Sequence, residues 1–308
     1  MKLNHRASTP ARFSRERRHV NPRHAPLLPP SRSAIRACSA ILATALLAVL
    51  VPGEGRAQAR LEAQYEASLA GIVVGKGAWN IDILEDQFSA NAYGGTSGLM
   101  KTFSSGSGNT SSQGKIVNGA LVATSYSAGT VTAKRTEQIH MTLQNGNVKE
   151  YGIDPTPPVD PDRIPVTEAH RRGVYDPMTA ALLRVPGNGD PLTPDACRTG
   201  AAIFDGRMRY DLKLDFKRAE NVKADKGYHG PAIVCAVYFT PIAGYIPDRP
   251  VIKYLAAQRD IEITFVPLSG TRILVPFRMR VPTPLGMAML EATQFVTQAL
   301  PPHIAKTQ

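Results

Sequence analysis

A ten-residue stretch of alternating side chains constrains the fold of this chain most strongly. From Arg207 to Phe216, charged and apolar side chains alternate without a break. Successive side chains of a β-strand point to opposite faces, so this period of two predicts a strand with one buried and one solvated face. The preceding pair Asp205-Gly206 favours a hairpin turn, because glycine tolerates a positive φ and aspartate bonds its own backbone. Residues 201–204 then form the partner strand.

Strand patterns recur along most of the chain. Residues 231–240 are apolar on both faces, which indicates a strand covered on both sides. The apolar runs 261–268 and 271–281 flank Ser269-Gly270 and predict another hairpin. Further strand patterns span residues 64–69, 73–84, 87–93, 115–127, 130–144 and 147–152. These patterns predict an all-β, mainly antiparallel fold.

Helical signals are few. Asp176-Pro177 caps a short predicted helix at 178–184, because aspartate accepts from free N–H groups and proline fits the first turn. Residues 252–258 are a second short candidate helix. The tail 285–298 fits a helix or a strand, and the extended run 281–284 before it favours the strand. We expect one or two short helices.

Two segments are irregular in composition. Residues 94–114 are rich in glycine and serine, which favours a mobile loop or an edge hairpin. Residues 154–165 contain five prolines, each of which lacks a backbone donor. An interdomain linker would have this composition, but the chain on neither side of this segment has the pattern of a complete domain core by itself. We therefore expect an extended surface crossing at 154–165 within one domain.

The first residues have the pattern of an export signal. Ten of the first 56 residues are basic, and an apolar run follows from Ala37 to Val51. Its fifteen residues are fewer than the roughly 20 that a transmembrane helix needs. Ala57-Gln58-Ala59 then supplies the small-x-small pattern behind which signal peptidase cuts. We expect a signal peptide at 1–59, cleavage after Ala59, and a single β-rich domain at 60–308 without a transmembrane span.

Removing this leader changes the charge of the chain. The net charge is +11 over the whole sequence, but residues 60–308 hold 26 basic and 23 acidic side chains, a net charge of +3. A large positive charge is the usual mark of nucleic-acid binding. Because most of the excess belongs to the leader, we expect no nucleic-acid partner.

Two cysteines remain after the leader, Cys197 and Cys235. An even pair in an exported chain is a candidate disulfide. Two buried free thiols or half of a metal site are the alternatives. No cysteine or histidine lies two to four residues from either one, as metal-ligand spacing would require. The disulfide is the favoured interpretation.

Motifs of catalysis are scarce. Ser112-Gln-Gly-Lys115 matches the Ser-x-x-Lys pattern, but that spacing works on a helix, and Gly114 predicts a loop entering a strand. Histidines 140, 170, 229 and 303 stand singly, without ligand spacing. We assign no catalytic, cofactor-binding or metal-binding residue, and we expect no cofactor.

One charged cluster stands apart from these motifs. Arg207, Arg209 and Asp211, with Asp205 close by, share a predicted strand face. They would suit an anionic ligand or a solvated face with cross-strand ion pairs. The ion pairs are favoured, because charged strand faces are usually solvated.

Five phrases of the chain together resemble an exported bacterial family known as domain of unknown function 3108. They are Tyr65–Gly75, Asp176–Leu183, Phe204–Leu212, Pro241–Tyr245 and Val275–Gly286. The resemblance spans nearly all of residues 60–308. It implies a periplasmic, β-rich single domain, and no reaction is attached to the family. A looser similarity to exported β proteins of the cell envelope, lipoprotein carriers among them, implies a twisted sheet curled into a half-barrel or spiral.

Three functions fit these observations. The favoured one is a non-enzymatic periplasmic β scaffold that supports the cell envelope through protein or peptidoglycan-associated partners. The second is a carrier that holds a lipid or other amphiphile on the concave face of the sheet, suggested by strands that are apolar on both faces. The third is a hydrolase that uses Ser112 and Lys115.

Overall fold

The computed structural model describes residues 58–98 and 105–301, which belong to one compact unit, Gly53–Gln308. All strands in these residues join one sheet. The strands are β1 (Gln58–Leu69), β2 (Ile72–Ile83), β3 (Gln87–Thr96), β4 (Gly106–Val117), β5 (Ala120–Thr132), β6 (Thr136–Gln144), β7 (Asn147–Asp154), β8 (Leu183–Arg184), β9 (Gly200–Phe204), β10 (Arg209–Lys223), β11 (Lys226–Gly227), β12 (His229–Ala243), β13 (Glu262–Pro267), β14 (Ile273–Thr283) and β15 (Gly286–Leu300). The helices are α2 (Pro177–Ala180) and α3 (Pro250–Ala257), with 3₁₀ turns η1 (Glu168–Arg171) and η2 (Pro194–Cys197).

The strand order confirms the predicted fold class. Along the sheet the order is β7-β6-β5-β4-β3-β2-β1-β15-β14-β13-β12-β10-β9. Neighbours on this path are antiparallel, whereas the short β11 pairs with β15 in parallel. The end strands β7 and β9 do not pair with each other, so the described sheet is open.

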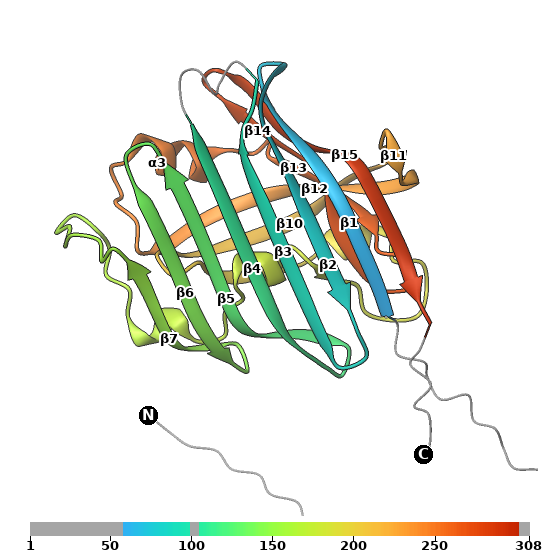
Figure 1. Ribbon diagram of the computed structural model, residues 1–308, viewed down its shortest axis with the longest axis horizontal. Helices are drawn as coiled ribbons and strands as arrows, with labels where there is room; N and C mark the ends of the chain where they lie inside the picture. Colours follow the sequence, from blue (N-terminus) through green and yellow to red (C-terminus); the bar gives the residue numbers. More distant parts are fainter. Residues whose placement is uncertain (1–57, 99–104, 302–308) are drawn as a thin grey trace, which may run out of the picture. The chain divides into compact units, whose positions relative to one another are not determined.

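The sheet turns back on itself and forms two layers. In Figure 1, β1 to β7 lie side by side, and β10 and β12 cross behind them. One buried cluster draws its members from both layers: Leu61 and Ile81 from the first, Phe277 and Phe295 from the second. The main core therefore lies between two parts of a single curled sheet, as the half-barrel prediction requires.

Local patterning explains why these strands form. In β1, buried Leu61, Ala63 and Tyr65 alternate with solvent-facing residues, the period of two of a one-sided strand. In β12, every residue from Ala232 to Val237 is buried, as predicted for a strand covered on both faces. Burial of apolar surface on both sides makes this strand the centre of the second layer.

Side chains bridge the open edges of the sheet. The ring of Tyr151 on β7 meets that of Phe204 on β9 edge to face, with centroids 5.3 Å apart. Next to it, Arg207 Nη2 lies 2.7 Å from Glu137 Oε1 on β6. The aromatic pair therefore connects the two end strands of the sheet, and the ion pair connects β6 with the turn before β10.

The glycine- and serine-rich stretch differs from its prediction. Most of its described residues lie in β3 and β4, which pair antiparallel, and β4 lies between β3 and β5 and not at an edge. Gly114 shows why small residues are needed there: a Cβ on it would lie 2.1 Å from the Val122 carbonyl oxygen. The pairing of β4 with β5 shifts register at Gln113/Gly114, and glycine admits this close approach.

Several predicted boundaries were wrong. A turn at 118–119 splits the predicted strand 115–127 into the end of β4 and the start of β5. The predicted helix 178–184 stops at Ala180, because Leu183 and Arg184 pair with β14 as β8. Residues 218–230, whose polar composition favours a loop, are mostly strand. Here β10 runs on to Lys223 beyond a register shift at Phe216/Arg218.

The proline-rich crossing contains no helix or strand between residues 155 and 165. It leaves β7 after Asp154 and reaches the far end of β12. There, the backbone N–H of Ile164 donates to the Tyr245 carbonyl at 2.9 Å, and the N–H of Gly244 donates to the Ile164 carbonyl at 2.8 Å. The crossing therefore connects the two layers.

Candidate functional site

An apolar cavity of about 350 Å³ lies between the two layers. Leu121 of β5 lines it from one layer, and Leu212 of β10 and Phe265 of β13 line it from the other. It separates the main core, to which Leu121 and Leu182 belong, from a second buried cluster around Cys235. Its remaining lining residues are Ala120, Tyr175, Pro177, Thr179, Ala180, Ala181, Leu182, Leu183, Arg184, Thr199, Gly200, Ala201, Ile203, Tyr210, Leu214, Ile263 and Pro276.

The segment from Tyr175 to Arg184 forms one wall of the cavity. At its start, the N–H of Tyr175 donates to the Ala202 carbonyl at 2.8 Å, which adds a bridge to β9. At its end, Leu183 and Arg184 pair with β14. Backbone bonds at both ends therefore fix this wall between two strands of the second layer.

A buried polar cluster anchors the same segment to the first layer. The Asp176 carboxylate accepts from the backbone N–H groups of Met178 and Thr179, each at 3.0 Å, and so caps α2. The Ser112 hydroxyl on β4 donates to Asp176 at 3.1 Å and lies 3.0 Å from Thr179 Oγ1. Burial raises the pKa of Asp176 above its usual range, opposed by these hydrogen bonds. Of the cluster, only Thr179 also lines the cavity.

The cavity wall carries little charge. Burial raises the pKa of Tyr210, which lines the cavity, and raises the pKa of the nearby Tyr126 to about 12, so both phenols stay neutral. Among the described residues that line the cavity, Arg184 alone is charged. The site therefore suits an apolar guest, with polar contacts confined to a few hydroxyl groups and one guanidinium.

A second cavity of about 420 Å³ adjoins the first. Ala120, Leu121 and Tyr175 line both. Tyr175 is 46% exposed. The two cavities therefore meet at a side chain that also reaches solvent.

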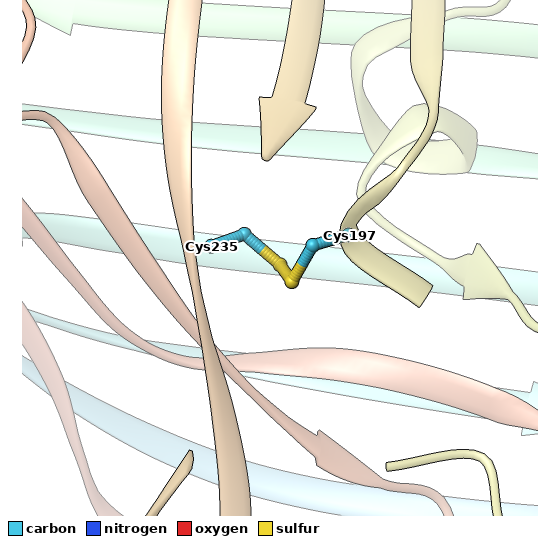
Figure 2. Close-up of a disulfide and its surroundings, with 2 residues drawn as sticks. All are labelled: Cys197 and Cys235. Atoms are coloured by element: carbon cyan, nitrogen blue, oxygen red, sulfur yellow. A yellow bond between two sulfur atoms is a disulfide. The ribbon is translucent and has the colours of Figure 1, made fainter. Parts of the chain in front are cut away.

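The predicted disulfide is confirmed. Cys197 and Cys235 are joined, with an S–S distance of 1.99 Å and Cα atoms 5.5 Å apart. Figure 2 shows the bridge linking η2 to the central strand β12. Both cysteines are fully buried within the second cluster, so the bridge fixes the loop before β9 against the second layer.

The Ser112–Lys115 pair is not assembled. On β4 Ser112 is buried, whereas Lys115 is exposed on the opposite face of the strand. A strand places residues three apart on opposite sides, so the helical spacing that the Ser-x-x-Lys pattern needs does not arise.

The predicted charged cluster is instead divided into separate structural contacts. Asp205 accepts from the N–H groups of Arg207 and Met208 and closes the turn before β10. Arg207 pairs with Glu137, and Arg209 pairs with Asp211 at 2.7 Å. The arginines therefore form ion pairs as expected, but the Arg209–Asp211 pair lies within β10 and not across strands, and the Arg209 side chain is largely buried.

The predicted cleavage pattern lies at the start of the described residues. Ala57 is outside them, as is the rest of the predicted leader, whereas Gln58 and Ala59 are the first residues of β1 and pair with Leu300 and Ala299. If the chain is cleaved after Ala59, β1 begins at Arg60. Cleavage at this position stays a prediction.

Neither a metal centre nor a membrane-spanning helix is found in the described residues. No group of three or more histidine, cysteine or acidic side chains with a geometry for a metal ion occurs at 58–98 or 105–301. No helix in these two ranges has the length and apolarity of a membrane crossing. His303 is outside the described residues, and His140 is exposed on β6.

The fold and the site define a protein with an open, curled antiparallel sheet that holds an apolar cavity between its layers. The chain belongs to the family described as "Protein of unknown function (DUF3108)", whose model matches residues 64–293. No curated protein matches it. A solved structure similar to this chain is a β-barrel-like protein of domain of unknown function DUF1849 from Brucella abortus, at 9% identity and a TM-score of 0.45, covering 80% of this chain and 98% of that one.

Sequence reasoning missed the cavity. The alternation in β10 identified Tyr210, Leu212 and Leu214 as one apolar face, but that face borders the cavity and is not fully packed. The sequence feature that pointed to this region was the Asp176-Pro177 helix cap. It marked the start of the cavity wall but did not show which strands the wall would contact.

Proposed function

We propose that this chain is an exported, non-enzymatic protein of the cell envelope that binds a small amphiphile between the layers of its sheet. The observation that carries the proposal is the apolar cavity of about 350 Å³. Small-molecule sites have volumes of roughly 300–1,000 Å³, and they combine apolar walls with a few polar groups. The cavity beside Tyr175–Arg184 has both properties.

The energetics favour an alkyl chain as the guest. Each methylene group moved from water to an apolar environment contributes about 0.8 kcal/mol. The leucine, isoleucine and phenylalanine side chains of β10 and β13 provide such an environment. Exposed Tyr175 and Thr199 line the same cavity and mark where a guest enters.

Export and the absence of catalysis are supported by separate observations. A disulfide is typical of oxidising compartments outside the cytoplasm. The leader pattern at 1–59 indicates the same route. Ser112, the nucleophile of the rival hydrolase hypothesis, is 1% exposed and does not line the cavity.

Native mass spectrometry tests ligand binding directly. The gently purified protein is expected to retain an amphiphile or to take up decanoate when challenged. Leu212→Trp fills the cavity and should abolish uptake. Leu285→Trp, at a hairpin tip that is 75% exposed, is the matched control and should take up the ligand normally. An unliganded mass that persists in the wild type after the challenge contradicts the proposal.

The packed cores support a second candidate, a structural scaffold of the envelope. Phe277 and Phe295 are fully buried, with ring centroids 5.8 Å apart, and the disulfide fixes the second cluster. A scaffold requires rigidity and partners, not a ligand. Its test is a deletion strain with a pull-down: unchanged detergent sensitivity and no captured envelope partner would rule it out.

A further inference from the structure

The rim of the cavity carries one positive charge, on Arg184. This residue is exposed on the two-residue strand β8. No carboxylate within the described residues forms an ion pair with it, although Arg207, Arg218 and Arg278 all have such partners. Arg184 therefore places an uncompensated cation beside an apolar cavity.

The guanidinium of Arg184 is positioned by the turn between β4 and β5. Its Nη2 donates to the Asn118 carbonyl at 3.4 Å. A Cβ on Gly119 would lie 2.7 Å from the same nitrogen, so the absence of a side chain at Gly119 leaves room for the guanidinium. Ala120 and Leu121, which line the cavity, follow directly. The charge is thus held next to the cavity wall.

Most of the donors of this guanidinium remain free for a ligand. An arginine side chain has five N–H donors in a planar fork, which matches the oxygens of a carboxylate or a phosphate. Within residues 58–98 and 105–301, only one long hydrogen bond engages them at Arg184. Because the side chain is exposed, an anion can replace water there without an additional burial cost.

We infer that the ligand of the cavity is a single-chain amphiphile with an anionic headgroup, whose charge is bound by Arg184 and whose chain lies against Leu121, Leu212 and Phe265. This inference rests on the proposed function. The cavity beside Arg184, taken without the adjoining one, has a volume of about 350 Å³, near the lower end of the range for small-molecule sites, which favours one chain over two there.

Calorimetric titration with three probes of equal chain length tests the headgroup. The probes are decanoate, decanol and decyltrimethylammonium. Because the Arg184 guanidinium pairs with a carboxylate but not with a neutral hydroxyl group, decanoate should bind several times more tightly than decanol. Decyltrimethylammonium should bind most weakly. Decyl phosphate, as a fourth probe, distinguishes a phosphate from a carboxylate headgroup.

Variants assign the preference to Arg184. Arg184→Gln should reduce decanoate binding to the level of decanol and leave decanol binding unchanged, while Arg184→Lys should retain part of the preference. Arg249→Gln is the matched control, because Arg249 is exposed and lines neither cavity. Thermal melting verifies that each variant is folded. Added salt should weaken only decanoate binding in the wild type, which tests the charge without any substitution.

The outcomes separate the two proposals. If none of the probes binds, the proposed amphiphile site itself is wrong. If decanoate and decanol bind equally in the wild type, or if Arg184→Gln keeps the preference for decanoate, the headgroup inference is overturned and the apolar site stands.

Discussion

The hydroxyl of Ser112 donates a hydrogen bond to the fully buried carboxylate of Asp176, 3.1 Å away and 64 residues along the chain. This bond joins the interior strand β4 to the first turn of α2. It therefore holds the wall of the cavity against the opposite layer of the sheet.

Removing the Asp176 carboxylate should loosen this wall. Asp176→Ala removes the cap of α2 and the carboxylate acceptor of the Ser112 hydroxyl, so we expect a loss of about 2–3 kcal/mol in the free energy of unfolding. Asp190→Ala is the control, because Asp190 makes a similar side-chain bond to a backbone N–H, at 2.9 Å, in an exposed loop. Urea denaturation measures both. Equal losses in the two variants would contradict the role of Asp176 as an anchor.

The pH dependence of this site has a definite sign. Burial raises the pKa of Asp176 in the folded state, so its contribution to stability is greatest below the usual aspartate pKa and is lost as pH rises through the folded pKa. Asp176→Asn cannot ionise. The deficit of this variant relative to the wild type should therefore be smaller at pH 8 than at pH 3.5, as measured by unfolding at both values. A larger deficit at pH 8 would mean that the folded state favours the ionised carboxylate instead.

Glu262 should show the opposite dependence. The bidentate bonds from Arg218, at 3.0 and 3.1 Å, lower the pKa of Glu262 to about 2, with Lys217 contributing. Its contribution to stability is present above the usual glutamate pKa and is lost as pH falls toward 2. Because Arg218 is partly exposed and screened, we expect Glu262→Gln to cost on the order of 2 kcal/mol at pH 7. The cost should vanish near pH 2.

The control for Glu262 is Glu150→Gln, because Glu150 is exposed on β7. This variant should unfold like the wild type at every pH. A similar pH dependence in both variants would show that a general charge effect, and not the Arg218 pair, is responsible.

Gly114 should not tolerate a side chain. A Cβ there would lie 2.1 Å from the Val122 carbonyl oxygen and 2.8 Å from the Phe88 ring, so Gly114→Ala forces strands β3 to β5 apart. Overpacking of this kind costs about 1–3 kcal/mol or more. Gly189→Ala, where a Cβ would meet no atom within 4 Å, should change stability little. Equal melting temperatures for the two variants would contradict the packing.

The disulfide should contribute substantially to stability. Cys197 and Cys235 are 38 residues apart, and closing such a loop stabilises the folded state by about 4 kcal/mol on the chain-entropy model. The double variant Cys197→Ala/Cys235→Ala leaves no free thiol and should unfold at a lower denaturant concentration than the wild type. Added reductant should lower the unfolding midpoint of the wild type and leave that of the variant unchanged. Two free thiols titrated in the unfolded, unreduced protein would disprove the bridge.

Local patterns in the sequence predicted most of the strands and the pairing of the cysteines. Alternation fixes which side chains share a face, as Leu212 and Leu214 do, and two cysteines allow one pairing. Alternation says nothing about the partner strand, so composition alone predicted a loop or an edge for the glycine-rich stretch that forms interior β4.

The candidate site, in contrast, exists only in the folded chain. Leu121 and Leu212 border one cavity because the sheet curls and brings β5 over β10. Arg184 reaches its rim because β8 pairs with β14, far along the chain. Such contacts depend on long-range strand pairing and on the volume left between layers, which are not encoded in any local pattern of residues.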